Sequence, residues 1–139
     1  MQKRLHIGVI CSRVRVEEKW IFGAMEKRGI DYDRLDDREI FFDLENPTPW
    51  LQYDAVLERS ISYNSGLYSL RLLNKFGVPT VNTAAVAEIC GDKLVTSALL
   101  AQAGVPQPHV VAAFTPEAAL AAIENFGYPV VLKPVVGSW

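Results

Sequence analysis

Short apolar runs alternate with amphipathic stretches along the first part of the chain. The run at 5–11 predicts a strand, and the stretch at 17–28 predicts a helix that ends at Gly29. A second helix is expected at about 66–76, whereas two prolines exclude regular structure at 45–49. The other apolar runs of this part have strand character and cover residues 30–35, 39–44, 55–59 and 78–82. Alternating units of this kind predict an α/β fold with a mostly parallel sheet.

The pattern changes after residue 83. Thr83 and Asp92 have the side chains of N-cap residues, and they predict two consecutive helices that extend to Cys90 and Ala103. The elements expected beyond these helices are a strand at 109–113, a helix from Thr115–Pro116 to Phe126 and a last strand at 130–133. We therefore divide the chain into two predicted domains, 1–83 and 84–139.

Composition and charge narrow the class of protein. Half of the 139 residues are apolar and 22% are charged, as in soluble globular proteins, and the net charge of -2 gives no overall attraction to nucleic acid or anionic lipid. The apolar run at 6–11 is too short for a signal peptide, and no segment approaches the roughly 20 apolar residues of a membrane helix. We expect a cytoplasmic protein that binds neither nucleic acid nor membranes.

Two common nucleotide-binding motifs are absent from the sequence. A dinucleotide site needs GxGxxG after the first strand, but residues 8–13 read GVICSR, and no GxxxxGK[ST] loop occurs. Cys11 and Cys90 form no CxxC pair and lie among apolar residues, so we expect them to be structural. His6 and His109 have no metal-ligand spacing. A nucleotide site in this chain must therefore be of another type.

Two lysines stand in positions that need an explanation. Lys93 follows the helix cap Asp92, where the helix dipole disfavours a cation unless an anion lies nearby. A solvated lysine that pairs with Asp92 or Glu88 is the alternative. Lys133 lies in a predicted strand that is apolar enough to be covered on both faces, so its ammonium needs a partner. A carboxylate, solvent at the strand end and a ligand phosphate are equal alternatives.

Polar residues also follow two of the predicted strands. Gly137 and Ser138 can begin a phosphate-binding loop of backbone N–H groups, or they form a plain turn. Arg59, Ser60 and Ser62 follow a strand at its carboxyl end, where open α/β sheets bind ligands, although they can equally cap the next helix. Their role is open.

Adjacent carboxylates occur at Glu17–Glu18 and at Asp36–Asp37. We expect both pairs to be solvated ends of secondary-structure elements and assign them no catalytic role.

Four motifs occur in a characteristic order, namely Gly91-Asp92-Lys93, GVPQP at 104–108, GYPVVLKP at 127–134 and GSW at 137–139. Together they resemble the ATP-grasp ligases of the RimK/LysX family, most of all the members that join α-aminoadipate to the carrier protein LysW in lysine biosynthesis. The likeness extends from the first strand to Trp139. It implies a Rossmann-like pre-ATP-grasp domain, followed by the beginning of the small ATP-grasp lobe.

The resemblance also implies roles for particular residues. Lys93 and Lys133 are expected to bind ATP phosphates, and Gly137, Ser138 and Trp139 to begin the flexible loop that covers them. In this family ATP phosphorylates a carboxylate, and an amine attacks the acyl phosphate. The implied partners are ATP, an amino-acid substrate (α-aminoadipate or glutamate) and a small LysW-like carrier protein.

The resemblance places the second ATP-grasp lobe, with its Mg²⁺ ligands, beyond residue 139. No metal ligand and no complete catalytic set is therefore assigned to this chain, and we expect it to be inactive alone. Apolar surface that the missing lobe would cover predicts a homo-oligomer. The alternatives are a fragment of a RimK-type glutamate ligase, or a non-catalytic α/β module for oligomerisation or for docking a carrier protein.

Overall fold

The computed structural model describes residues 4–137. This part of the chain forms one compact unit that extends to Ala87 and another that starts at Glu88. The domain division that the sequence suggests after residue 83 stays a prediction. None of the helices in residues 4–137 is long and apolar enough to cross a membrane.

The first unit alternates strands and helices, as its apolar pattern predicts. Its elements are β1 (His6–Ile10), α1 (Val16–Lys27), β2 (Asp31–Leu35), the 3₁₀ helix η1 (Thr48–Trp50), β3 (Ala55–Glu58), α2 (Tyr63–Lys75) and β4 (Thr80–Val81). The four strands form one sheet in the order β2-β1-β3-β4, and every pair is parallel. The predicted α/β fold with a parallel sheet is confirmed.

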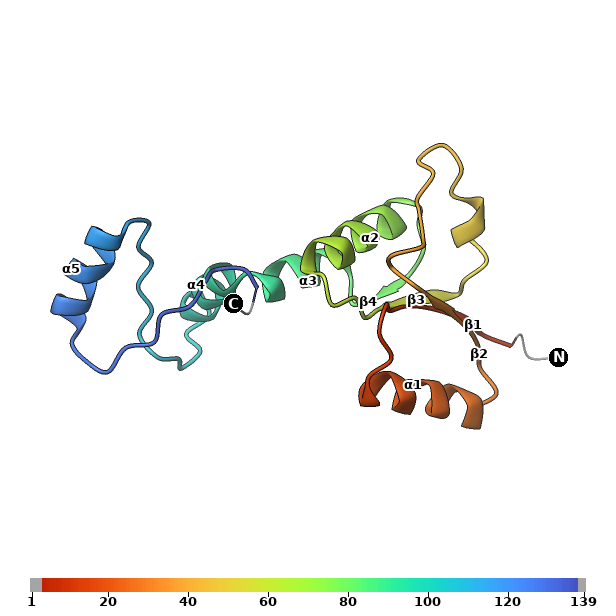
Figure 1. Cartoon of the computed structure of the whole chain (residues 1–139), viewed down its shortest axis with the longest axis horizontal. Helices are drawn as coiled ribbons and strands as arrows, with labels where there is room; N and C mark the ends of the chain where they lie inside the picture. The colour runs from red at the N-terminus through yellow and green to blue at the C-terminus, as the bar shows by residue number, and fades with distance from the viewer. Residues whose placement is uncertain (1–3, 138–139) are drawn as a thin grey trace. The chain divides into compact units, whose positions relative to one another are not determined.

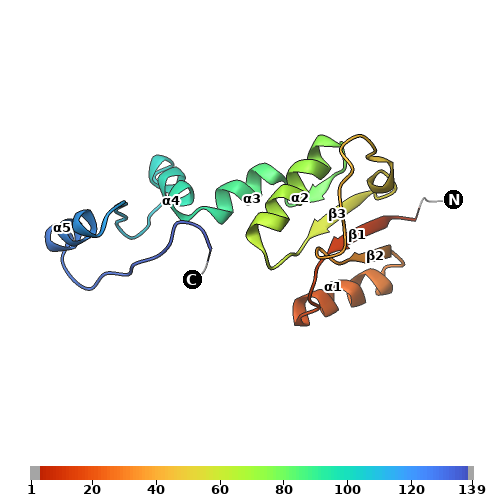
Figure 2. The ribbon, with the colours of Figure 1, turned by 45° about the horizontal axis from the view of Figure 1, so that its top comes forward.

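Helices α1 and α2 lie on opposite faces of this sheet, as Figures 1 and 2 show. Alternation along β1 supplies a core to each face. One core gathers Ile7, Val9 and Cys11 with Met25 of α1. The other core contains six buried residues, Ile10, Trp50, Tyr53, Val56, Leu73 and Val78. Strand β1 is therefore covered on both sides, which fixes its register in the middle of the sheet.

The prediction of a strand at 39–44 is wrong. Residues 40–43 have no regular structure, yet Ile40 and Phe42 pack against the core on the α2 side. The Phe42 ring stacks on Trp50 with 4.4 Å between the ring centroids. The apolar alternation of this segment therefore arises from side-chain packing, because no backbone ladder includes it.

The second unit contains helices and irregular segments. Helix α3 (Ala84–Gly91) spans the change of unit, and α4 (Lys93–Gln102) and α5 (Pro116–Phe126) follow it. Thr83, Asp92 and Thr115 accept hydrogen bonds from the first turns of these helices, which confirms the three predicted caps. Among the residues described, these helices contain none that is fully buried.

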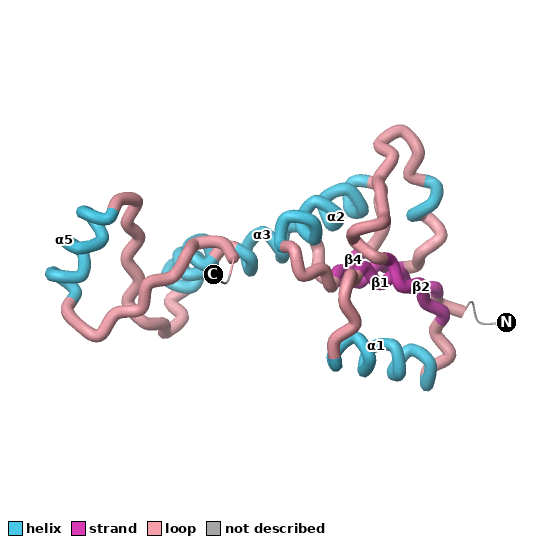
Figure 3. Tube along the Cα trace, viewed as in Figure 1, coloured by secondary structure: helices cyan, strands magenta, loops and turns pink. Residues whose placement is uncertain are grey.

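The strands predicted at 109–113 and 130–133 are both wrong. Figure 3 draws these segments as loops. A strand requires a neighbour to accept and donate its backbone hydrogen bonds, and the described part of the second unit offers only an isolated antiparallel bridge between Asp92 and Val136. Val131 and Leu132 are 79% and 74% exposed, so the covered faces inferred for this segment are absent as well.

A buried carboxylate ties α1 to the end of β3. Glu18 is fully buried, and its Oε1 accepts from Nε of Arg59 at 2.9 Å and from Nη2 of Arg15 at 2.8 Å. Its Oε2 accepts from the backbone N–H and from Nε of Arg15, each at 3.0 Å. The hydrogen bonds from Arg15 are the main reason that the pKa of Glu18 falls to about 2, against the opposing effect of desolvation. The prediction that Glu18 is solvated is therefore wrong.

A second close contact joins β3 to α2. Glu58 accepts a hydrogen bond from the backbone N–H of Ser60 at 2.5 Å, and its carboxylate lies against Gly66. A Cβ atom on Gly66 would approach the Glu58 carboxyl group to 2.8 Å. Glycine at this helical position therefore allows the end of β3 to approach α2 closely.

Replacing Glu18 with glutamine should lower the free energy of unfolding by about 2 kcal/mol at neutral pH, because two guanidinium groups lose a buried anion. The folded-state pKa of Glu18 is depressed from 4.5 to about 2, so its contribution is complete above pH 4.5 and disappears as the pH falls toward 2. Urea unfolding of both proteins between pH 7 and pH 2 measures this difference. Glu17→Gln, an exposed neighbour, should change stability by less than about 0.5 kcal/mol. A Glu18→Gln protein as stable as the parent at pH 7 would contradict the assignment.

Two glycine-to-alanine substitutions in helices should have opposite effects. Gly23 of α1 has no atom within 4 Å of an added Cβ, so Gly23→Ala should stabilise the protein by roughly 0.5–1 kcal/mol. Gly66→Ala forces Glu58 away from the Ser60 amide and should destabilise the protein by about 1 kcal/mol. Thermal unfolding of the two variants gives the comparison. Equal stabilisation by both would show that Glu58 moves at no cost.

Candidate functional site

Lys93 is the first residue of α4, directly after its N-cap. The cap is formed by Asp92, whose Oδ1 accepts from the backbone N–H groups of Leu94 and Val95, both at 2.9 Å. The start of α4 therefore presents a lysine beside the positive end of a helix dipole, with the nearest carboxylate already used as a cap.

Residues 135–137, which we call the strap, run beside the start of α4. The backbone N–H of Lys93 donates to the carbonyl oxygen of Val135 at 2.9 Å, and Asp92 forms the antiparallel bridge with Val136. The Lys93 ammonium donates to the carbonyl oxygen of Gly137. The structure thus brings together Lys93 and Gly137, two of the residues that the sequence singled out.

Lys133 lies on the irregular segment that leads into the strap. Its side chain is exposed, and within residues 4–137 no hydrogen-bond or ion-pair partner is found for its ammonium. Contrary to the prediction, burial does not force a partner on Lys133, because its segment is neither a strand nor covered. A role of Lys133 toward a ligand phosphate stays a prediction.

Gly137 is the last residue of the strap. It has a φ angle of 82°, a left-handed conformation that glycine adopts readily. Ser138 and Trp139, the other two residues predicted to contact ATP, lie outside the described residues. The cationic donor at this place is the Lys93 ammonium, since the backbone N–H groups of residues 93–95 already donate to Val135 and Asp92. A lysine ammonium suits the binding of an anion rather than proton transfer.

Arg59, Ser60 and Ser62 occupy the carboxyl end of β3 in the first unit. Ser62 caps α2, because its Oγ accepts from the backbone N–H of Ser65 at 3.3 Å. Arg59 is held by Glu18, as described above. The Oγ atom of Ser60 is buried and has no hydrogen-bond partner among the described residues. The helix-capping alternative therefore applies to Ser62, whereas Ser60 lacks such a role.

Three further reactive groups are the thiols of Cys11 and Cys90 and the carboxylate of Asp36. Cys11 is buried as expected, but Cys90 is exposed. Asp36 is paired with Arg38, whose hydrogen bonds keep the pKa of Asp36 below its usual value. Within residues 4–137, no group of three or more His, Cys, Asp or Glu side chains is placed to hold a metal ion.

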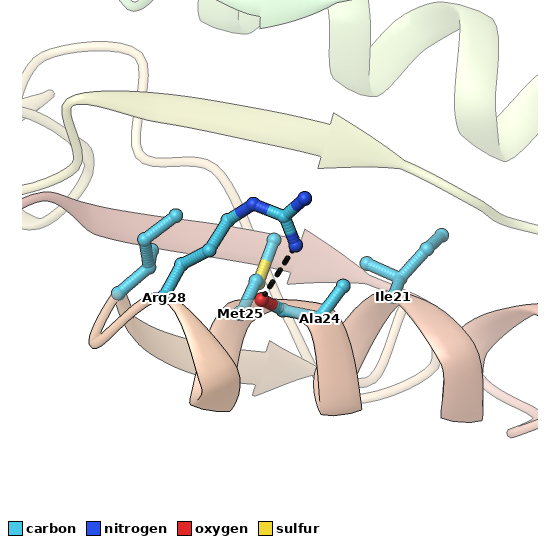
Figure 4. A pocket seen from close by; sticks show the side chains of 5 residues that line it. Ile21, Ala24, Met25 and Arg28 are labelled. Carbon is cyan, nitrogen blue, oxygen red and sulfur yellow. Dashed lines mark hydrogen bonds between the residues drawn. The ribbon is translucent and has the colours of Figure 1, made fainter.

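A surface hollow of about 310 Å³ lies beside the second half of α1. Figure 4 shows Ile21, Ala24, Met25 and Arg28 around it, and Ile30 completes the lining. The Arg28 guanidinium donates to the carbonyl oxygen of Ala24 at 3.1 Å. The lining is almost entirely apolar, so this hollow lacks the polar groups that a catalytic or nucleotide site requires.

The contact between Lys93 and the strap, and the contact between Glu18 and Arg59, were missed by reasoning from the sequence. The Lys93–Gly137 contact joins residues 44 positions apart, and no local pattern reports such a pairing. Glu18 did carry a local signal, since a glutamate three residues after an N-cap position is the back half of a capping box. The Arg59 contact, which completes its burial, has no signature in the sequence.

Known proteins resemble this chain over nearly its whole length. A glutamate–LysW ligase ArgX from Sulfurisphaera tokodaii is 36% identical over 97% of this chain and 47% of its own length. An α-aminoadipate–LysW ligase LysX from Saccharolobus solfataricus is 34% identical over 90% of this chain and 46% of its own length. This chain therefore spans about half the length of the curated relatives that it matches.

A solved structure and a family model agree with these relatives. The crystal structure of a RimK domain protein ATP-grasp from Sphaerobacter thermophilus superposes with a TM-score of 0.81 at 28% identity, over 96% of this chain and 50% of the other. The family model of the LysX preATP-grasp domain matches residues 7–89, more than half of the sequence. The chain thus belongs to the LysX pre-ATP-grasp family.

Proposed function

We propose that this chain supplies part of the ATP site of a ligase that joins a carboxylate to an amine. The observation that carries the proposal is the position of Lys93, whose ammonium at the start of α4 reaches the carbonyl oxygen of Gly137 in the strap. A phosphate oxygen at this place can replace the carbonyl oxygen of Gly137 as the acceptor for the Lys93 ammonium.

The proposed task of the two lysines is to position phosphate groups. ATP phosphorylates the carboxylate of one substrate, and an amine then displaces phosphate from the acyl phosphate. Lys93 and Lys133 hold the phosphates and stabilise the charge during transfer, and Gly137, Ser138 and Trp139 begin the loop that covers them. Neither lysine is required to transfer a proton.

When ATP is bound, magnesium would supply positive charge that neutralises the transferred group. The described residues do not fit a magnesium site, since they contain no cluster of carboxylates or other ligands. That the metal ligands lie outside this chain stays a prediction, and we assign no metal-dependent step to the described residues.

The names of the relatives support an acidic amino acid as one substrate. They include glutamate–LysW ligases and α-aminoadipate–LysW ligases, and a tetrahydromethanopterin:α-L-glutamate ligase from Methanosarcina acetivorans is 43% identical over 68 residues, which are 49% of this chain and 21% of its own length. We propose glutamate or α-aminoadipate as substrate, a LysW-like carrier protein as partner, and a role in lysine or arginine biosynthesis. A homo-oligomer and a cytoplasmic location stay predictions.

A non-catalytic module for oligomerisation or docking is the second candidate function. The apolar side chains exposed in the second unit favour it, with Phe114 at 88% and Tyr128 at 81% exposure. The two candidate functions predict different responses to nucleotide. Only the ligase requires the strap, Lys93 and Lys133 to bind ATP.

Removal of either lysine should weaken the binding of ATP to the purified chain. A charge-assisted hydrogen bond contributes roughly 1.5–3 kcal/mol, so Lys93→Ala and Lys133→Ala should each raise the Kd for ATP by about tenfold or more. Isothermal titration calorimetry measures the Kd of the parent chain and of each variant. Lys75→Ala, a basic side chain in the last turn of α2, is the matched control and should leave the Kd unchanged. Equal affinities for all four proteins would remove the support for this nucleotide site.

The chain alone should not hydrolyse ATP at the rate of an ordinary ligase. Charge-assisted contacts without a bridging metal stabilise the transferred phosphoryl group too little for turnover. Release of inorganic phosphate, measured with Mg²⁺, glutamate and a carrier protein present, should stay at the background of a protein-free sample. Steady release that Lys133→Ala abolishes would contradict this expectation.

A further inference from the structure

The carboxyl ends of β1 and β3 form a second place where a ligand is expected. The strands are neighbours, yet β1 connects through α1 to β2 on its other side, while β3 continues into α2 on the opposite face. Open α/β sheets bind ligands where the connections diverge in this way. The residues that follow the two strands lie close together, because the backbone N–H of Arg59 donates to the carbonyl oxygen of Ile10 at 2.9 Å.

Arg59 is held in a fixed position at this edge. Its Nε and Nη2 lie 2.9 Å and 2.8 Å from the same oxygen of the buried Glu18. Within residues 4–137, no acceptor is found for Nη1, and the side chain is 35% exposed. A guanidinium that is anchored on one side and open on the other is ready to bind a planar anion.

The buried carboxylate does not balance the arginines around it. Glu18 is shared by Arg15 and Arg59, so a single negative charge faces two positive ones. Arg13, which follows β1, is exposed and has no partner among the described side chains. Among the described residues, Nη1 of Arg59 and the guanidinium of Arg13 are therefore the cationic donors without an acceptor at this edge.

A buried hydroxyl at this edge lacks a hydrogen-bond partner among the described residues, and the first turn of α1 begins nearby with an N-cap that has no acceptor. The Oγ atom of Ser60, directly after Arg59, is buried with no hydrogen bond to any described residue. The N-cap of α1 is Arg15, a side chain with no acceptor atom, so it cannot cap the first backbone N–H groups of the helix. An unpaired buried hydroxyl normally costs free energy, which a bound ligand can recover.

We propose that this edge binds a carboxylate group through Arg59, Ser60 and Arg13. The carboxylate of Glu58 lies at this edge, because it accepts a hydrogen bond from the Ser60 N–H. Its negative charge disfavours a phosphate dianion more than a carboxylate with a single charge. The site belongs to the first unit, so it does not depend on nucleotide binding at the strap.

The test is a titration of the full ¹⁵N-labelled chain, followed by NMR. The probes are L-glutamate, a blocked tri-glutamate peptide and inorganic phosphate. Either carboxylate probe should produce saturable shifts of the backbone amides at 12–16 and 59–62, and phosphate should bind more weakly. Saturation by glutamate identifies a free acid as the ligand, whereas saturation by the peptide alone identifies a carboxylate carried on a polypeptide.

Three variants separate binding from folding. Ser60→Ala removes a hydroxyl that has no partner, so it should keep the stability of the parent and weaken carboxylate binding by about threefold or more. Arg59→Gln should weaken binding by about tenfold or more, with its folded state checked in the same spectra. Arg4→Gln, which removes an arginine paired with Asp31 at the start of β2, should change nothing at the site.

The proposal is overturned if neither carboxylate probe gives saturable shifts at these amides. Tighter binding of phosphate than of carboxylate, or carboxylate binding that survives both Ser60→Ala and Arg59→Gln, would overturn it equally. Because ATP is absent from every sample, these outcomes leave the proposed nucleotide site untouched.

Discussion

Lys93 joins the start of α4 to the strap through two different donors. Its backbone N–H binds the carbonyl oxygen of Val135, and its ammonium binds that of Gly137. The helices of the second unit have no fully buried residue among those described, so this contact does much to define the local geometry. Hydrogen bonds to a charged donor contribute roughly 1.5–3 kcal/mol, and a phosphate oxygen competes well with a neutral carbonyl for the same ammonium.

The first unit is held together in another way. Its sheet has a core on each face, and the buried carboxylate of Glu18 fixes both the first turn of α1 and the end of β3. Such a platform holds the side chains at its carboxyl edge in place before a ligand arrives. The second unit presents the Lys93 ammonium at the start of α4, beside the loop that forms the strap.

Local signals explain which parts of the fold the sequence predicts. Thr83, Asp92 and Thr115 each cap a helix, because an N-cap bonds to backbone groups only two or three residues away. The predictions of strands at 109–113 and 130–133 are wrong for the opposite reason. A strand depends on hydrogen bonds to a neighbouring strand, and the apolar pattern of a segment does not show whether that neighbour exists. The same limit hid the burial of Glu18 on α1, because its partner Arg59 follows β3 and is 41 positions away in the sequence. The proposed roles of Lys93 and Lys133 arose from motif likeness, and the structure adds the contact of Lys93 with the strap.

The central claim is that Lys93 and Lys133 act on one bound triphosphate. The ¹³Cε–¹Hε signals of the two lysines, followed by NMR during a titration of the chain with ATP, test this most directly. If both side chains contact the same nucleotide, both signals shift and saturate with one common Kd, while the signal of Lys75 stays in place. Shifts at only one of the two lysines, or two clearly different Kd values, would contradict the account.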